Sequence, residues 1–292
     1  MSNSVKAQFA KELSGHYALP LVLQKLKLTR SSYYYALRHP PKPTRPELWA
    51  KASEIFHRTK NGCGHRQVLM CLRTEVDCRI SKKTVLKLMK QAGLVCQIRR
   101  KKCARYNSYR GQVGKVAKNV IKRDFNAQLP WQKLGTDVTE FAQPWGKAYL
   151  ALIYDFCSKE IVAWSISRTP NLSQQQRLLK DLISVLPSQA KPILHSDMGW
   201  QYQQACWVNL LKQNGIVQSM SRKGNCLDNA ATEQVFGHLK DEFFRGQLWK
   251  RYEDFEKDLN NYVIYWNNQR RQLKLKGLTP VEYRCQSLSH LD

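Results

Sequence analysis

The sequence has no long hydrophobic run and no paired cysteines. No apolar stretch approaches the roughly 20 residues that a membrane-spanning helix needs, and residues 1–10 lack the basic-then-apolar pattern of a signal peptide. The nine cysteines are scattered and never spaced as Cys-x-x-Cys, which argues against a disulfide framework or a cysteine zinc site. We therefore expect a soluble cytoplasmic protein without a membrane partner.

Acidic residues are scarce in the first 123 residues. This part holds 28 Lys and Arg but only 5 Asp and Glu, whereas residues 124–292 hold 20 and 17. Nearly all of the net charge of +26 therefore lies in the N-terminal part of the chain. Phosphate neutralisation is the usual physical reason for such an excess, so DNA is a better expectation than an anionic membrane surface.

Residues 1–45 are expected to form a helix-turn-helix-like segment followed by a linker. Apolar residues recur at helical spacing over residues 17–38, and Ser31 is the expected N-cap of the second of two short helices. The run Tyr33-Tyr34-Tyr35 is interpreted as part of a small core. Four prolines in residues 39–46 cannot continue a helix and predict a stiff linker.

A second helix-turn-helix-like domain is expected at residues 46–95. Ser81 is the expected N-cap of its last helix, whose first turn carries Lys82 and Lys83 as candidate DNA contacts. The alternative is a small helical bundle with solvated lysines, but two such units in one basic part favour DNA binding. The three expected helices span residues 47–59, 65–75 and 81–92.

Residues 96–125 are expected to form a basic linker arm. Between residues 99 and 123 there are ten Lys and Arg and no acid, as in a segment that follows a phosphate backbone. A disordered linker that becomes ordered on DNA is an equally good interpretation. The candidate phosphate contacts at its start are Arg99, Arg100, Lys101 and Lys102.

From residue 126 the pattern changes to alternating strands and helices, so residues 126–292 are expected to form one α/β domain with a C-terminal helical tail. Three strands joined by short turns predict an antiparallel meander, and helices then alternate with two further strands. This is the element order of an RNase H-like fold. The expected strands are 134–141, 148–156, 160–167, 192–195 and 216–220, and the expected helices are 173–186, 203–214 and 228–244.

Three acids stand out in that domain. Asp137 lies within the first expected strand, Asp197 follows the fourth, and Glu233 lies on the last helix, with 35 residues between the latter two. Carboxylates at the ends of neighbouring strands can hold two Mg²⁺ ions, which prefer oxygen ligands and can promote in-line displacement at phosphorus. The alternative for each acid taken singly is a turn or a solvated surface position.

Five other residues near these acids receive separate interpretations. Asp228 is expected to be the N-cap of the last helix, and Asp155 to be structural. Glu140 should face the side of the strand opposite to Asp137, and His195 should be a core or hydrogen-bonding residue rather than a ligand. Lys240, two helical turns after Glu233, is a candidate phosphate contact or a surface lysine.

Three segments are the most specific in the catalytic domain: Leu134-Gly-Thr-Asp-Val-Thr139, His195-Ser-Asp-Met-Gly-Trp-Gln-Tyr202 and Asp228-Asn-Ala-Ala-Thr-Glu233. They closely resemble bacterial insertion-sequence transposases of the DDE class. Within that class, the chain is similar to the second, OrfB-type product of the group that is encoded in two overlapping frames. The resemblance covers roughly residues 15–290. It departs from the family pattern at Met198 and Trp200, where Arg and Ser are common, and in the Cys63-Gly-His-Arg-Gln67 segment.

The resemblance implies a retroviral-integrase-like catalytic core in which Asp137, Asp197 and Glu233 are the catalytic and metal-binding residues. It also implies Mg²⁺-dependent cleavage and strand transfer, with Mn²⁺ as a substitute, on element ends and target DNA. A homo-oligomer on DNA, an upstream-frame (OrfA-type) segment as partner and association with the nucleoid belong to the same expectation. The alternatives are a non-catalytic DNA-binding regulator of the element and an RNase H-like nuclease.

Because the positive charge is concentrated in residues 1–123, DNA binding should reside there and depend strongly on salt. For six to ten phosphate contacts, affinity should fall about 10³- to 10⁵-fold between roughly 50 and 200 mM salt. Titrating labelled duplex with the whole chain and with a fragment of residues 124–292 tests this. Equal affinity and equal salt slope for the two would contradict the assignment.

Overall fold

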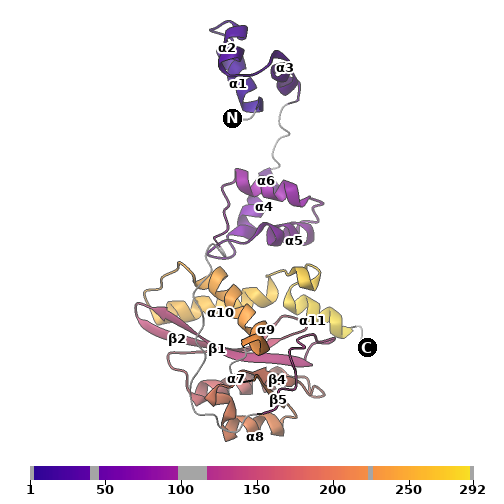
Figure 1. Ribbon diagram of the computed structural model, residues 1–292, viewed down its shortest axis with the longest axis vertical. Helices are drawn as coiled ribbons and strands as arrows, with labels where there is room; N and C mark the ends of the chain where they lie inside the picture. The colour runs from indigo at the N-terminus through magenta and orange to yellow at the C-terminus, as the bar shows by residue number, and fades with distance from the viewer. Residues whose placement is uncertain (1–2, 40–45, 98–116, 223–225, 290–292) are drawn as a thin grey trace. The chain divides into compact units, whose positions relative to one another are not determined.

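The computed structural model describes residues 3–39, 46–97, 117–222 and 226–289 (Figure 1). The chain divides into two compact units, residues 1–49 and 50–292. None of the helices in the described part of the chain is long and apolar enough to cross a membrane. The predicted arm residues Arg99 to Lys102 lie outside the described residues.

The first unit is a small helical bundle of α1 (Asn3–Leu13), α2 (Leu19–Lys25) and α3 (Arg30–Arg38). The predicted Ser31 cap is wrong, because Thr29, two residues earlier, is the N-cap of α3. Its hydroxyl accepts the Ser32 N–H at 3.2 Å. Of the three tyrosines, only Tyr33 joins the core, while Tyr34 and Tyr35 are 42% and 66% exposed. The core interpretation therefore holds for one ring of the three.

The next helices are α4 (Pro46–Phe56), α5 (His65–Glu75) and α6 (Lys82–Gln91). Ser81 caps α6 as predicted, since its hydroxyl accepts the Thr84 N–H at 3.1 Å. Each helix buries one apolar stripe and leaves the opposite face polar, which is the pattern of a helical domain with a small core. The buried residues of these helices are Ala52, Ile55, Phe56, Val68, Cys71, Leu72, Val85, Leu88 and Met89.

A five-stranded mixed sheet forms the centre of the second unit, with strand order β3-β2-β1-β4-β5. The antiparallel meander predicted for the first three strands is confirmed. β4 pairs in parallel with β1, and β5 pairs in parallel with β4. The RNase H-like order predicted from the sequence is therefore present. The strands are β1 (Lys133–Gln143), β2 (Gly146–Asp155), β3 (Ile161–Ser167), β4 (Ile193–Ser196) and β5 (Val217–Met220).

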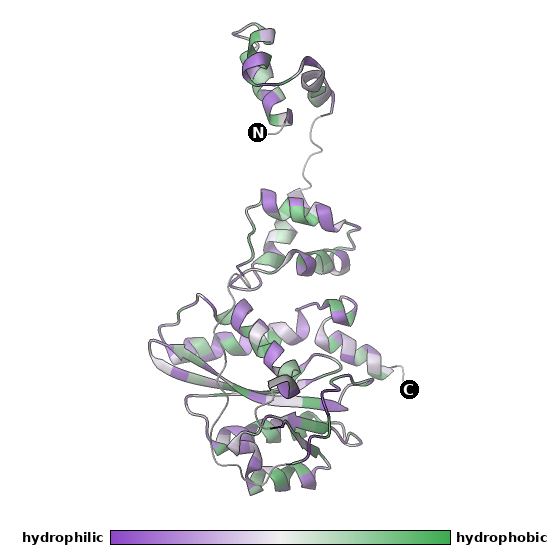
Figure 2. Cartoon of the chain, in the orientation of Figure 1, coloured by the Kyte–Doolittle hydropathy of each residue, from purple (hydrophilic) through white to green (hydrophobic). Residues whose placement is uncertain are grey.

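Helices cover both faces of this sheet (Figure 1). One core cluster joins sheet residues to α9 (Ala230–Leu239) and α10 (Tyr252–Asn268), and a second joins the opposite face to α7 (Leu172–Val185) and α8 (Ala205–Gln213). These helices carry both hydrophobic and hydrophilic residues (Figure 2), as amphipathic helices on a sheet do. The helix predicted over residues 228–244 is divided, since a π-helical turn, Lys240–Phe244, follows α9. The last helix is α11 (Pro280–Ser289).

Gly135 of β1 packs closely against Thr232 of α9. It pairs with Tyr154 on β2 and His195 on β4. A Cβ built there would meet the Thr232 hydroxyl and lie 2.6 Å from the Phe156 ring. Only glycine therefore lets α9 pack so closely on the strand that carries Asp137.

We expect Gly135→Ala to destabilise the protein by about 1–3 kcal/mol, because the added methyl group must push α9 away from β1. Urea unfolding measures this. Gly237→Ala is the matched control, since nothing lies within 4 Å of a Cβ on that helical glycine, and it should raise stability by about 0.5–1 kcal/mol. Equal stability of Gly135→Ala and the wild type would contradict the packing argument.

Candidate active site

Asp137 lies on β1, on the face of the sheet that α9 covers. One carboxylate oxygen accepts the Val138 N–H at 2.7 Å, and the other accepts the side-chain N–H of Asn229 at 3.0 Å. Burial raises the pKa of Asp137, and the nearby charges of Asp197 and Glu233 raise it further. The carboxylate is thus held in place while its charge is poorly solvated.

Asp197 directly follows β4, which pairs in parallel with β1 over three residues. Because neighbouring parallel strands run in the same direction, their carboxyl ends meet at one edge of the sheet, and Asp197 lies close enough to raise the pKa of Asp137. Its own carboxylate accepts the Gly199 N–H at 2.8 Å. Burial raises the pKa of Asp197 as well.

Glu233 lies in the first turn of α9 and is exposed. Its pKa is raised by partial burial and by the charge of Asp197. The structure therefore brings together the three acids singled out from the sequence, two from strands and one from a helix, although they are far apart along the chain.

The three acids supply only hard carboxylate oxygens, the ligand type that Mg²⁺ and Mn²⁺ prefer. Within the described ranges, no group of three or more Asp, Glu, His or Cys side chains is arranged so that it could hold a metal ion. Neighbouring carboxylates repel one another, and a divalent cation would offset this repulsion. The donor chemistry fits such a cation, and Glu233, being exposed at a helix start, is the donor with room to move.

Asp228 is not the N-cap of α9, contrary to the prediction. The cap position belongs to Asn229, and Asp228 lies in a preceding 3-10 turn. Its buried carboxylate accepts hydrogen bonds from Arg123 at 2.7 Å, Arg222 at 3.0 Å and Asn119 at 3.0 Å. These partners, with Arg222 first, hold the pKa of Asp228 well below its usual range. Arg123, distant in sequence, and Arg222, six residues before Asp228, bind this carboxylate in place of the local helix N–H groups.

His195 is fully buried, and burial lowers its pKa, so the neutral ring is favoured. Its Nε2 donates to the Asp228 carbonyl at 2.8 Å, and its Nδ1 lies 2.9 Å from the Ser219 hydroxyl. The prediction of a hydrogen-bonding core histidine is confirmed. His195 thereby joins β4, β5 and the turn that leads into α9.

Asp155 is structural, as predicted, because its carboxylate accepts the backbone N–H groups of Trp131, Cys157 and Ser158. Glu140 is exposed and forms an ion pair with Lys147 at 3.0 Å.

Sequence reasoning missed two uncharged neighbours of the aspartates. Asn229 holds Asp137, and its side-chain oxygen is buried without a partner in the described structure. Tyr202 is fully buried; burial raises the pKa of its phenol, and the charges of Asp137 and Asp197 raise it further. Both lie in the motifs of the family resemblance, and that was the only signal that could have found them, because neither is charged.

The candidate DNA contacts lie elsewhere. Lys82 and Lys83 are exposed in the first turn of α6. The Lys240 ammonium lies 5.7 Å from the centre of the Phe141 ring, and its charge helps to lower the pKa of Glu140. Next to Asp197, Met198 packs against the core cluster that includes α7 and α8, and Trp200 is 39% exposed.

Two family models for an integrase core domain match residues 127–226 and 233–288, and a model for an HTH-like domain matches residues 45–102. Together with the mixed sheet and the carboxylates at its edge, these matches define a protein with an integrase core and a preceding HTH-like domain.

Two relatives narrow this class. The putative transposase InsK for insertion sequence element IS150 of Escherichia coli is 41% identical over 277 residues, which are 94% of this chain and 96% of that protein. An uncharacterized transposase-like protein of Haemophilus influenzae is 46% identical over 220 residues, 75% of this chain and 100% of that one. The chain therefore belongs to the insertion-sequence transposases of the OrfB type.

A solved structure, the HTLV-2 integrase catalytic core domain in complex with magnesium, covers 53% of this chain and 97% of that chain at 17% identity and a TM-score of 0.41. The family assignment rests on the sequence matches and not on this likeness.

In metal-free buffer, the contribution of Asp137 and Asp197 to the free energy of unfolding should fall as the pH rises above about 4. The folded pKa values of Asp137 and Asp197 lie above the unfolded value of 3.8, so the folded state binds more protons in this range and loses stability as they dissociate. Asp137→Asn should therefore be more stable relative to the wild type at about pH 8 than at about pH 5. Urea unfolding in a chelator at both pH values measures this.

The Glu140→Gln variant is the control for that comparison, because Glu140 is exposed and outside the cluster. A stability difference between Asp137→Asn and the wild type that does not change with pH would show that the carboxylates do not repel one another in the folded protein.

Proposed function

We propose that the chain is a catalytically active DDE transposase that cleaves insertion-sequence ends and joins them to target DNA by direct phosphoryl transfer. The observation that carries the proposal is the carboxylate cluster. The charges of Asp197 and Glu233 raise the pKa of Asp137, and the charge of Asp197 raises the pKa of Glu233 on α9. Such a cluster costs stability without a cation, which is a reason to expect a functional site there.

Asp137, Asp197 and Glu233 would hold two Mg²⁺ ions, with Mn²⁺ as a substitute. When bound, such a pair makes the attacking water or 3′-hydroxyl more acidic and stabilises the leaving oxygen. In this chain, Asn229 and the Val138 N–H orient the Asp137 carboxylate, and the Gly199 N–H orients that of Asp197. These hydrogen bonds fix the aspartates in advance, so that less ordering is needed when DNA arrives.

DNA is the proposed substrate, held by a helix-turn-helix-like segment at residues 1–45, a second such domain at 46–95 and a basic arm at 96–125, ahead of a catalytic core at 126–292. The HTH-like match at residues 45–102 and the exposed lysines of α6 support the second domain. A homo-oligomer on DNA, an upstream-frame segment as partner and an association with the nucleoid are part of the same proposal.

If the proposal holds, Asp137→Asn, Asp197→Asn and Glu233→Gln should each reduce cleavage and strand transfer by more than about 100-fold, since even outer partners of metal ligands are worth 10- to 100-fold. DNA binding should remain. The assay incubates purified protein with element-end duplex and Mg²⁺ and resolves cleaved and joined products.

Glu140→Gln is the control, because it removes an exposed carboxylate from the same strand. Identical products from the wild type and Asp197→Asn would exclude catalysis by this triad. Cleavage without any joined product would instead indicate a nuclease, and DNA binding without metal-dependent cleavage would indicate a regulator.

A further inference from the structure

A cavity of about 670 Å³ lies beside α9 within the second unit. One wall is α5, including Arg66 and Gln67, and the opposite wall includes Lys159 from the turn between β2 and β3 and Lys274 from the segment after α10. Gln234, the neighbour of Glu233, also lines it. The cavity therefore begins next to the carboxylate cluster but contains none of its three acids.

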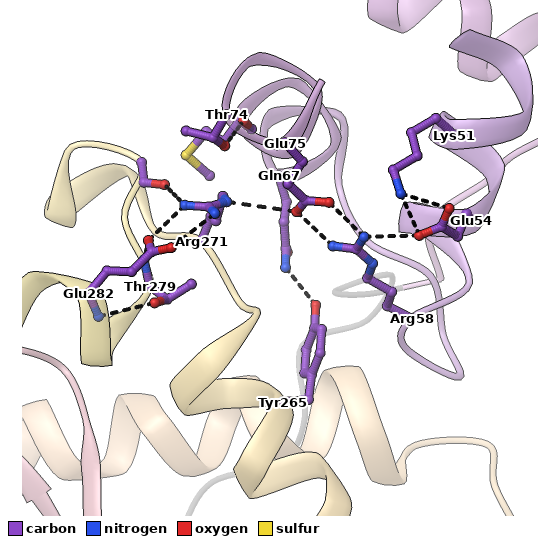
Figure 3. Close-up of polar contacts among 12 residues, drawn as sticks. Lys51, Glu54, Arg58, Gln67, Thr74, Glu75, Tyr265, Arg271, Thr279 and Glu282 are labelled. Atoms are coloured by element: carbon purple, nitrogen blue, oxygen red, sulfur yellow. Dashed lines mark hydrogen bonds and ion pairs between the residues drawn. The ribbon is translucent and has the colours of Figure 1, made fainter. Parts of the chain in front are cut away.

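Specific contacts hold the two walls together. Gln67 donates a hydrogen bond to the Tyr265 hydroxyl at 2.7 Å, and Arg271 lies 3.8 Å from Glu75 while pairing with Glu282 at 2.8 Å (Figure 3). The spacing between α5 and the core is thus set by polar contacts from both sides. A ligand would find this cavity already formed.

Its cations fall into two groups. Arg270 and Arg271 are neutralised, the first by the buried Glu242 at 2.5 Å and the second by Glu282. Arg66, Lys159 and Lys274 form no ion pair among the residues that the structure describes, although the nearby charge of Asp155 raises the pKa of Lys159. Three segments distant in sequence therefore bring three positive charges without an ion pair to one cavity.

Lys159 shows that these charges are near each other. Its pKa is lowered, first by burial and then by the charge of Lys274. Its ammonium donates to the Phe156 carbonyl, and its backbone has a φ of 62°, a left-handed conformation that side chains other than Gly and Asn rarely adopt. An anion bound in the cavity would offset the repulsion between these two lysines.

We propose that this cavity is a second DNA-contact site, in which Arg66, Lys159 and Lys274 hold phosphates of the sugar-phosphate backbone of a strand that runs along α9 past Gln234. The inference rests on the proposed function, since it takes DNA as the ligand. The lining rings Tyr154 and Trp266 are 6% and 1% exposed, so neither of these two offers a free face for base stacking. The proposed contact is to phosphates and should therefore be independent of sequence. The chain's own arm is a poor occupant, because its residues 99–123 are basic and contain no acid.

The test uses the full chain with Lys159→Gln and Lys274→Gln combined. Binding to labelled element-end duplex and to an unrelated duplex is titrated at several salt concentrations in a chelator, which prevents cleavage. We expect the affinity for both duplexes to fall about tenfold or more and the salt slope to fall by about 2, one for each lost phosphate contact. Without DNA, the variant should melt at the same or a higher temperature, because repulsion between the two lysines is removed.

The matched control combines Lys180→Gln with Lys212→Gln, exposed lysines of α7 and α8 on the opposite face of the sheet. If the Lys159→Gln and Lys274→Gln variant has the same affinity and salt slope as this control, the cavity proposal is overturned. It is also overturned if the variant loses binding only to the element-end duplex, or if the wild-type chain binds no duplex. If the variant shows the expected loss of binding but the wild-type chain never cleaves DNA, the proposed catalysis is overturned and the cavity proposal stands.

Discussion

The repulsion among three carboxylates is the constraint on which this structure depends. Asp137 lies on β1, Asp197 directly follows β4 and Glu233 lies on α9. Burial raises the pKa of both aspartates, and the charges of Asp197 and Glu233 raise that of Asp137 further. The folded chain tolerates this cost because the surrounding elements are tightly joined. Gly135 lets α9 approach β1, and the parallel pairing of β1 with β4 aligns the two aspartates.

The buried Asp228 has the opposite electrostatic environment. Arg123, Arg222 and Asn119 stabilise its charge, and its backbone carbonyl accepts the Nε2–H of His195. This network ties β4, β5 and the turn before α9 into one support for the acids. The same helix carries Glu233 of the carboxylate cluster and Gln234, which lines the cavity with Lys159 and Lys274.

The sequence predicted the order of strands and helices along the chain, the meander, the Ser81 cap and the roles of His195 and Asp155, because alternation, turn residues and capping residues act locally. It failed where contacts in the folded chain decided the outcome. Asp228 has the residue type and position of a helix cap, yet Arg123 and Arg222 bind it. Ser31 failed for a smaller reason, since Thr29, two residues earlier, has the same capping chemistry.

The sequence by itself determined the family, the order of strands and helices and the three acids, since motifs, periodicity and charge are properties of the chain. Only the tertiary structure decided that Asn229 holds Asp137, that the charges of both aspartates act on Tyr202 and that Lys159 and Lys274 meet without an ion pair. These residues lie on different elements, and their contacts depend on how the elements pack. Local patterns carry no record of such distances, because they arise only when the sheet and helices close on one another.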